Sequence, residues 1–593
     1  MCTTVIVGKA VSKTGRVILG HNEDAGGRVM HQQFYCPGGK HAAGEMLTAE
    51  HGRAHVPQAE ETLTTYWSNM LQIDGSSFDQ GYANEAGLAI CSNGGGSSFT
   101  GDDPDEASLG LKDGGVGFLL RRVMAERART PREAIEIAAK LLDEYGYFGS
   151  ARNYSVANKD EAWVLNVVKG HHYVAKRVPD DQVMLISNML AIRHVDINDK
   201  ENVIASPGLI EYAIEKGRYT PAVEGDYSDF DFAAAYQSDE NRHAPTKSYR
   251  MRLGWWKITG DYYKDELHYP EILPPAHPMG VEDVIEVLGL TCYESYATRG
   301  DGKEDAFHVS ARDISRSQTR ESWVMDLQDQ PLFNTMWRCT SYQDTGVYIP
   351  WFPMSGIIPD GYQWMTLEEA RENHFNLKPE YLDFDLDRSY HIYATIGELT
   401  NFNRGLLPGV TRVKRLYTED VFERTAAVIE TARTQSEEDA KKTLGTFTCD
   451  ECDKMDTVYD ALLDAITTHV MSVEADTMSV SKEETVEVVL YGSPEFNVQG
   501  LDIDTVYWSL GFTGKKESVN APAKPVSVRF DDIDGDGIVD AVLTFNAHEV
   551  AQFGIPGCVT DTYLRGLCNC LRFVAMDTVL FTECRPRRDF WPV

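Results

Sequence analysis

The second residue of the chain, Cys2, constrains its fold and chemistry more than any other feature. It follows Met1 directly and stands at the head of residues 3–8, a run rich in β-branched side chains that predicts a strand. Once Met1 is removed, Cys2 carries a thiol nucleophile and a free α-amine on one residue. An α-amine has a pKa of about 7.7 to 8, so it can accept a proton near neutral pH. A cysteine here can also be an ordinary core residue, because cysteine is often buried.

Length and composition indicate a globular protein of more than one domain. The chain has 593 residues, which is more than one hydrophobic core normally serves. Apolar residues make up 42% and charged residues 25%, as in ordinary globular proteins. No run approaches the roughly 18 consecutive apolar residues of a membrane helix, so no membrane span is expected. The start lacks the basic and apolar segments of a secretory leader, which predicts a cytoplasmic protein as written, or a secreted or cell-surface one if a leader was removed.

The net charge argues against one class of partner. The chain carries 91 acidic and 56 basic residues, for a net charge of −35. Nucleic-acid binding is driven by neutralisation of phosphates with basic side chains, so no nucleic-acid partner is expected.

The distribution of strand and helix patterns predicts an α+β fold with a boundary near residue 475. Strand-like segments around residues 89–91, 162–168 and 183–186 alternate with helical patterns, and this mixture indicates sheets covered by helices. Residues 130–146 form the clearest helix, with a capping box, proline at the first helical position and a terminal glycine. Another helical region is expected over about 419–442. Residues 2–475 are therefore predicted as one domain and residues 476–593 as a smaller β-rich domain.

A polar triplet, Asn22-Glu23-Asp24, follows the second strand pattern at residues 16–20. If the first two strands pair through a turn near residues 12–15, this triplet lies close to Cys2. A carboxylate there could hold the α-amine and the amide could orient the thiol. Taken alone, the same three residues are an unremarkable turn.

Three further patterns supply amide and guanidinium groups. Asn93 lies beside Gly94-Gly95-Gly96, whose exposed backbone N–H groups could join it in an oxyanion hole. Asn188 ends another strand pattern and offers a second amide. Arg250 and Arg252 could bind a carboxylate in two-pronged fashion. A flexible loop explains the glycines equally well.

Six motifs occur in order along the chain: Cys2-Thr3-Thr4, Asn22-Glu23-Asp24, Asn84-Glu85-x-Gly87, Glu161-Ala162-Trp163-Val164-Leu165, Ser187-Asn188 and Tyr348-Ile349-Pro350-Trp351-Phe352. Together they resemble the cysteine dipeptidases of the N-terminal nucleophile superfamily. These are the PepD-like and secernin-like enzymes, relatives of the bile-salt and penicillin V amidohydrolases. The resemblance covers about residues 2 to 470.

The resemblance implies a four-layer αββα sandwich that hydrolyses the amide bond of a dipeptide without a metal or organic cofactor. It implies Cys2 as the nucleophile, with its own α-amine as general base. Asp24 matches an aspartate near that amine, Asn188 an active-site asparagine and Arg250 an arginine that supports the thiolate. Asn93 is the looser match to the oxyanion asparagine.

Substrate contacts are predicted for His21, Asn22 and Arg252. His21 is also a departure from the family pattern, because relatives commonly carry arginine just before Asn-Glu-Asp. Histidine can be neutral at pH 7, so electrostatic lowering of the thiol pKa is expected to be weaker or pH-dependent in this chain.

The C-terminal region contains a separate metal-binding pattern. Asp532, Asp534, Asp536 and Asp540 occupy positions 1, 3, 5 and 9 of a loop with glycine at position 6, as in calcium-binding loops. Position 12 is Leu543 rather than the glutamate of an EF-hand, and the flanks are strand-like. The pattern predicts a structural Ca²⁺ site within a β domain, and an acidic turn without metal is the alternative.

The leading interpretation is a cysteine dipeptidase, with a dipeptide as substrate and a homo-oligomer as a compatible assembly. An amidohydrolase acting on N-acyl substrates with the same machinery is the nearest alternative. The alternative from a different class is a catalytically dead surface protein that binds through its β domain.

Overall fold

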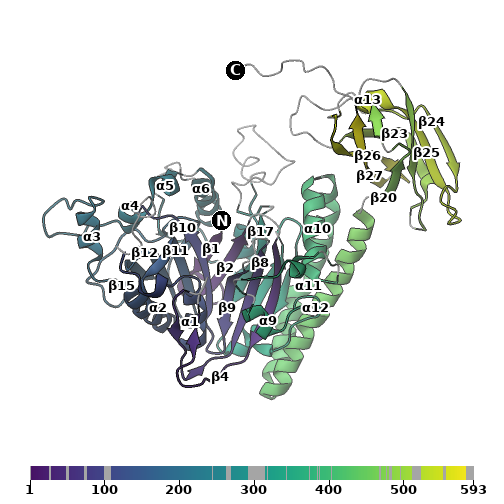
Figure 1. Cartoon of the computed structure of the whole chain (residues 1–593). Helices are drawn as coiled ribbons and strands as arrows, with labels where there is room; N and C mark the ends of the chain where they lie inside the picture. Colours follow the sequence, from purple (N-terminus) through teal and green to yellow (C-terminus); the bar gives the residue numbers. More distant parts are fainter. Residues whose placement is uncertain are drawn as a thin grey trace, which may run out of the picture. The chain divides into compact units, whose positions relative to one another are not determined.

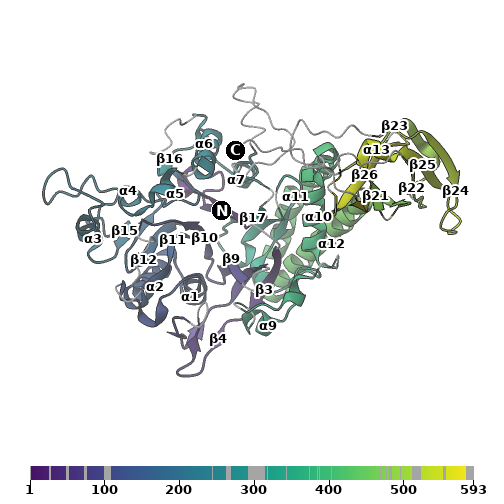
Figure 2. The ribbon, with the colours of Figure 1, turned by 45° about the horizontal axis from the view of Figure 1, so that its top comes forward.

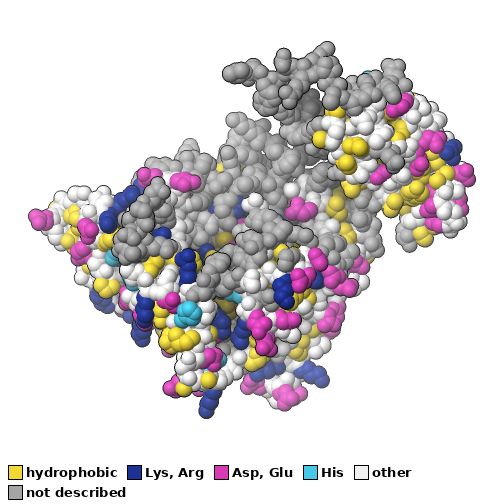
Figure 3. Space-filling model, viewed as in Figure 1, with side chains coloured by type: hydrophobic (Ala, Val, Ile, Leu, Met, Phe, Trp, Pro, Cys, Tyr) yellow, Lys and Arg dark blue, Asp and Glu magenta, His cyan; other side chains and the backbone are white. Residues whose placement is uncertain are grey.

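The computed structural model divides into two compact units, Met1–Leu462 and Leu463–Val593 (Figure 1). The structure describes residues 2–582 except 26–28, 49–52, 73–76, 99–108, 244, 262, 264–268, 292–313, 317, 342, 373, 375, 384, 386, 403, 467–468, 476, 480–483, 495, 511–522, 552–553, 555 and 570. Acidic side chains are spread over the visible surface of both units (Figure 3), in keeping with the net charge of −35. Among the described residues, no helix is both long enough and apolar enough to cross a membrane.

Cys2 lies at the start of a central strand of the first sheet, here called sheet I. Sheet I has seven strands in the order β16-β14-β1-β2-β17-β18-β19. Their bounds are β1 Thr3–Val7, β2 Ile18–Asp24, β14 Val183–Ile186, β16 Ile272–Leu273, β17 Thr319–Asp326, β18 Thr335–Thr340 and β19 Tyr348–Trp351. All of the pairings are antiparallel. The predicted pairing of the first two strands is confirmed, and it aligns Thr3 with Asn22.

A second antiparallel sheet, here called sheet II, has eight strands in the order β15-β13-β12-β11-β10-β9-β8-β3. Their bounds are β3 Val29–Cys36, β8 Thr65–Gln72, β9 Ser77–Asn84, β10 Ala89–Gly95, β11 Tyr147–Ala157, β12 Ala162–Gly170, β13 Tyr173–Arg177 and β15 Val203–Ala205. Four short strands form two separate pairs: β4 Gly39–Lys40 with β7 Glu61–Thr62, and β5 Met46–Leu47 with β6 Val56–Pro57.

The two sheets pack face to face between layers of helices. Side chains join them directly: the Thr4 hydroxyl of β1 donates to Asn93 Oδ1 of β10 at 2.7 Å, and Ser68 of β8 donates to Glu321 of β17 at 2.7 Å. Helices α1 (Leu119–Arg127) and α2 (Pro131–Tyr145) cover the outer face of sheet II, as Figures 1 and 2 show, and α6 (Pro245–Thr259) and α7 (Val281–Leu288) cover sheet I. This arrangement confirms the predicted αββα sandwich.

The predicted helix over 130–146 is confirmed as α2. Thr130 caps it by accepting a hydrogen bond from the Glu133 N–H, and Gly146 ends it with a φ of 70°, which favours glycine. The other α-helices of the described residues are α3 Leu209–Glu215, α4 Phe232–Tyr236, α5 Asp239–His243, α9 Leu367–Glu372, α10 Ser389–Phe402, α11 Leu407–Arg433, α12 Glu437–Ile466 and α13 Ala547–Ala551. The helical region expected over 419–442 differs from the structure, because α11 ends at Arg433 and α12 begins at Glu437; the two helices lie side by side in Figures 1 and 2.

The second unit contains one main sheet, with the strand order β23-β26-β27-β20-β22-β25-β24, and β21 pairs with β27. Its strands are β20 His469–Val473, β21 Thr477–Ser479, β22 Thr485–Leu490, β23 Leu501–Leu510, β24 Ser527–Asp531, β25 Asp540–Asn546, β26 Val559–Cys568 and β27 Leu571–Thr582. The unit begins ahead of the boundary expected between 475 and 476, because β20 already belongs to this sheet. The predicted calcium loop connects β24 to β25.

Candidate active site

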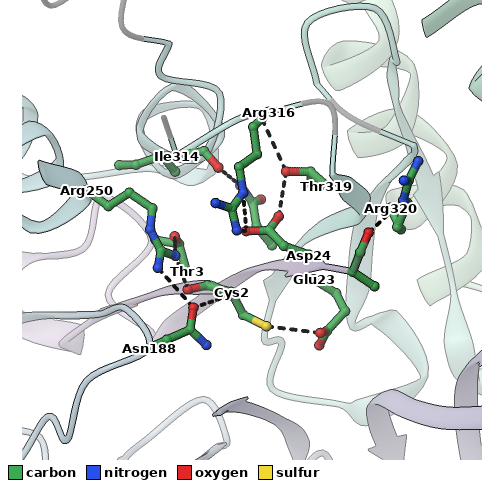
Figure 4. A network of polar contacts seen from close by, with 12 residues as sticks. Cys2, Thr3, Glu23, Asp24, Asn188, Arg250, Ile314, Arg316, Thr319 and Arg320 are labelled. Carbon is green, nitrogen blue, oxygen red and sulfur yellow. Dashed lines mark hydrogen bonds and ion pairs between the residues drawn. The ribbon is translucent and has the colours of Figure 1, made fainter. Parts of the chain in front are cut away.

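Two different side chains hold the two reactive groups of Cys2. The backbone nitrogen of Cys2 donates to Asn188 Oδ1 at 2.6 Å, and its Sγ donates to Glu23 Oε1 at 3.0 Å (Figure 4). Cys2 is buried, with 5% of its surface exposed. The thiol and the backbone nitrogen are therefore fixed independently of each other.

The pairing of β1 with β2 decides which side chains reach the thiol. Successive side chains of a strand point to opposite faces. His21 and Glu23 share one face of β2, the face toward sheet II. Cys2 and Thr4 of the neighbouring strand point the same way, as the 2.7 Å contact between His21 Nδ1 and Thr4 Oγ1 shows. Asn22 occupies the opposite face, where its Nδ2 donates to the carbonyl of Leu288 at 2.9 Å.

The hydrogen-bond partners of His21 show which of its ring nitrogens carry protons. Thr4 Oγ1 donates its single proton to Asn93 Oδ1, so it accepts the contact from His21 and Nδ1 carries a proton. The other ring nitrogen, Nε2, lies 3.2 Å from Glu23 Oε2, and a proton there completes an ion pair with the carboxylate. Burial alone would lower the pKa of His21, but Cys91 and Glu23 beside it raise that pKa well above 6.5. The geometry fits an imidazolium.

These neighbours also shift the pKa values of the thiol and the carboxylate. Burial and the charge of Glu23 raise the pKa of the Cys2 thiol. Burial would raise the pKa of Glu23 as well, yet the hydrogen bonds from His21 and Cys2 outweigh it and lower that pKa. The resting pair is therefore a protonated thiol beside an ionised carboxylate.

Asn93 presents its amide N–H₂ toward the inside of the site. Its Oδ1 is occupied by Thr4, which fixes the orientation of the amide. Its Nδ2 is buried and has no hydrogen-bond partner among the residues that the structure describes. A buried donor without a partner costs free energy, so a donor left in this state is suited to an oxygen that arrives with the substrate.

Asn188 and Arg250 fix the N-terminal strand. Asn188 Oδ1 accepts from the Cys2 nitrogen and from Arg250 Nη2 at 3.0 Å, and its Nδ2 donates to the Gly94 carbonyl at 2.9 Å. Arg250 Nη1 donates to the Cys2 carbonyl at 2.6 Å and to Thr3 Oγ1 at 3.2 Å. Arg250 was predicted to support the thiolate, whereas these contacts position the backbone of Cys2 (Figure 4).

Asp24 lies in a different setting from the one expected beside the amine. Its Oδ2 accepts from Arg316 Nη2 at 2.7 Å and from Arg316 Nε at 3.0 Å, and its Oδ1 accepts from Thr319 Oγ1 at 2.6 Å. Both partners are buried. Of the two carboxylates in the triplet, Glu23 contacts the thiol and Asp24 contacts Arg316. Glu23, Thr4 and Arg316 were not among the predicted site residues.

The three residues predicted to touch substrate have internal partners in the structure. Asn22 is fully buried, donates to the carbonyls of Leu288 and Ile314 and accepts from Gln343, so all of its polar groups are used in the core. His21 is also fully buried, with both ring nitrogens engaged. Arg252 lies over the Tyr249 ring at 5.7 Å. In an α-helix, positions two apart do not face the same way, so Arg252 diverges from Arg250.

Two groups of potential metal ligands come together in the described part of the chain. One is Cys2, His21 and Glu23, which the contacts above already satisfy without a metal. The other is Asp532, Asp534 and Asp536, whose carboxylates lie within 4.8 Å of one another on the surface. The fourth predicted ligand, Asp540, is buried and accepts from the Gly492 N–H at 2.9 Å and the Ile533 N–H at 2.8 Å.

The first strand thus presents Cys2 to a polar site between the two sheets. The model of peptidase family C69 matches residues 1–392, and the chain belongs to this family. It is therefore a peptidase, which confirms the resemblance found in the sequence.

Three curated relatives agree with this assignment. A probable dipeptidase of Latilactobacillus sakei is 25% identical over 379 residues, which cover 62% of this chain and 78% of the relative. A probable dipeptidase of Salmonella dublin is 24% identical over 59% of this chain and 80% of its own length. A dipeptidase of Bifidobacterium longum is 24% identical over 63% of this chain and 75% of its own.

Proposed function

We propose that this peptidase is a dipeptidase in which Cys2, exposed by removal of Met1, is the nucleophile. One observation carries the proposal: the nitrogen and the sulfur of Cys2 form hydrogen bonds with separate side chains, those of Asn188 and Glu23. Removal of Met1 would convert the Cys2 nitrogen, which Asn188 already binds, into a free α-amine. The relatives named as dipeptidases support the choice of substrate.

The α-amine is the better general base of the two groups near the thiol. Because the pKa of the Cys2 thiol is raised, attack on a carbonyl requires a base to remove the proton. The pKa of Glu23 is lowered, so its carboxylate is a poor proton acceptor at neutral pH. An α-amine with an ordinary pKa near 8 is matched to this task. Glu23 then serves to orient the thiol.

The proposed reaction has two stages. As Sγ attacks the peptide carbonyl, the thiol proton passes to the α-amine and the Asn93 Nδ2 donates to the developing oxyanion. The protonated amine returns that proton to the leaving nitrogen, which departs and leaves a thioester on Cys2. Water, deprotonated by the same amine, attacks the thioester carbonyl, the C–S bond breaks to release the first amino acid, and the amine returns the proton to the sulfur.

A substrate panel tests the proposal. The enzyme, with its N-terminus checked by mass spectrometry, is incubated with a dipeptide, a tripeptide, an N-acylated amino acid and a conjugated bile acid. We expect Cys2 to be the first residue and the dipeptide to be hydrolysed fastest. Hydrolysis confined to the acylated substrates would indicate the amidohydrolase alternative, and no hydrolysis at all would indicate a dead scaffold.

The ion pair of His21 with Glu23 predicts a pH-dependent stability. A histidine whose folded pKa is raised stabilises the fold fully below its unfolded pKa of 6.5, and this contribution is lost as the pH rises through the folded value. Replacing His21 by glutamine is therefore expected to lower the free energy of unfolding by about 2 kcal/mol at pH 6, with a smaller difference at pH 10. Thermal melting of both proteins from pH 6 to 10 measures this.

The matched control is His277→Gln, since His277 is an exposed histidine on the same unit. Its melting temperature should follow that of the wild type at every pH. A deficit of His21→Gln that stays constant from pH 6 to 10 would contradict the assigned imidazolium.

For the second unit we propose a structural Ca²⁺ site in the loop between β24 and β25. The clustered carboxylates of Asp532, Asp534 and Asp536 supply the oxygen ligands that Ca²⁺ prefers, and their mutual repulsion would be relieved by the ion. Asp540 fixes the end of the loop through its two backbone hydrogen bonds.

Calcium removal is expected to destabilise the second unit of the full chain. At calcium concentrations about 100 times the Kd, binding contributes about 2.7 kcal/mol, so EDTA should lower the corresponding melting transition by several degrees. Asp534→Asn combined with Asp536→Asn should remove the response to EDTA. Asp540→Asn should lower the transition both with and without calcium, because it disrupts the loop itself. An EDTA response that persists in the double variant would contradict the site.

A further inference from the structure

Two arginines that the mechanism does not use converge on one hydroxyl. Arg121 of α1 and Arg152 of β11 each donate from Nη1 to Ser92 Oγ at 3.0 Å. Their guanidinium carbons lie 4.9 and 4.3 Å from the centre of the same Phe118 ring. Two like charges are thus held side by side around a neutral partner.

Within the described part of the chain, no carboxylate lies close enough to either guanidinium to form an ion pair with it. Neither Arg121 nor Arg152 forms an ion pair with any described residue. By contrast, the buried Arg316 and Arg338 form ion pairs with carboxylates, and Arg250 donates to a backbone carbonyl. Arg121 is fully buried, and its Nε and Nη2 have no hydrogen-bond partner there; the same holds for Nε of Arg152. Unpaired buried charge is costly, so a pair of this kind is suited to an anion supplied from outside.

One arginine of the pair, Arg152, lies close to the residues that hold Cys2. Arg152 is the strand partner of Gly94, whose carbonyl accepts from the Asn188 side chain that grips the Cys2 nitrogen. A methyl group added at Gly94 would lie 3.8 Å from Asn188 Nδ2 and 3.9 Å from Arg152 Nη2, with no described atom closer. Arg152 and Gly94 are both half-buried, whereas Arg121 is enclosed behind them.

The charge of Arg152 is maintained in this position. Burial would lower the pKa of its guanidinium, but Tyr147 and Tyr154, with a smaller contribution from Glu23, raise that pKa above its ordinary value. Glu23 is the carboxylate that contacts the thiol, so Arg152 is within electrostatic reach of the reacting atoms.

We propose that Arg152, backed by Arg121, binds the free carboxylate of the dipeptide. This inference rests on the proposed function and adds the group that sets substrate length. In a dipeptide, three bonds separate the attacked carbonyl carbon from the terminal carboxylate carbon, which spans about 3 to 4 Å. A longer peptide places an uncharged amide at that distance. The subsite therefore selects a peptide bond with one residue after it.

The experiment compares a dipeptide with its C-terminal amide, which differs only in the charge of this group. Binding to the Cys2→Ser protein is measured by calorimetry, so that turnover is not needed. We expect the free acid to bind about ten- to a hundredfold more tightly than the amide, as for hydrogen bonds to a charged group. With Arg152→Met added, the two ligands should bind within about threefold of each other. The exposed Arg129→Met in the same background is the matched control and should keep the preference.

The outcomes separate the two proposals. Equal affinity of acid and amide when Arg152 is intact, or the same loss for both ligands in Arg152→Met, would overturn the carboxylate subsite in favour of a structural role. Arg152→Lys keeps the charge without the planar fork and should retain part of the preference. If the wild type prefers the free acid but hydrolyses no dipeptide, the proposed function fails and the subsite stands.

Discussion

Replacing Cys2 by serine should lower kcat/KM for a dipeptide by about a thousandfold or more, the scale seen when a nucleophile is removed from a catalytic unit. The serine hydroxyl is similar in size and can still donate to Glu23 Oε1, which the thiol contacts at 3.0 Å. The fold should therefore be retained while the nucleophile becomes far weaker. Steady-state kinetics and the melting temperature, measured on the same samples, separate these two effects.

Cys339→Ser is the matched control for this substitution. Cys339 is a buried free thiol on β18 of the same sheet, and its hydrogen bonds to described residues go to the backbone carbonyls of residues 340 and 341. Its replacement should leave kcat/KM within a few-fold of the wild type. Full activity in Cys2→Ser, or an equal loss in Cys339→Ser, would remove Cys2 from the role of nucleophile.

The predicted strand pair brings the polar triplet close to Cys2, whereas the resemblance assigned the carboxylates by motif position rather than by strand geometry. The β1–β2 pairing was predicted from two β-branched runs and a turn, and the structure confirms it. The alternation along β2 then places His21 and Glu23 on the face of Cys2, and Asn22 on the opposite face. Applied to the predicted pair of strands, the same alternation would have singled out Glu23 from the sequence.

Site residues from distant segments of the chain, such as the partners of Asp24, could not be predicted because no local sequence pattern marks them. Arg316 and Thr319, which hold Asp24, lie almost 300 positions away from it along the chain. Strand β17 begins there and pairs with β2, yet it is buried along nearly its whole length, so it lacks the alternation of a half-exposed strand. Long-range pairing of this kind follows from the whole fold.

The convergence of Arg121 and Arg152 on Ser92 could not be predicted from the sequence for a similar reason. Neither residue belongs to a motif, and one lies on a helix while the other lies on a strand. Ser92 brings them together only because β10 and β11 are neighbours and α1 covers that face of sheet II. Their significance comes from the lack of an ion-pair partner among the described residues, which is visible only in the structure.

A free α-amine on Cys2 should raise dipeptide hydrolysis by about a hundredfold or more over the same chain with that nitrogen capped. General acid–base groups contribute about 10² to 10⁴ in rate, and the geometry offers no equivalent base, because the pKa of Glu23 is lowered. The clearest comparison uses one molecule in two states. A removable peptide is fused directly before Cys2, and kcat/KM is measured before and after a site-specific protease releases it.

The fusion carries its own controls. Cys2→Ser in the same fusion should remain inactive after cleavage, which excludes a contribution from the protease. Asn188→Ala should reduce the gain on cleavage more than Arg129→Met does, because Asn188 Oδ1 accepts the hydrogen bond from the released nitrogen and Arg129 is a surface residue. If the capped chain is as active as the cleaved one, the amine is not the general base. The thiol proton must then pass to Glu23, which is the only other described side chain that accepts a hydrogen bond from the thiol.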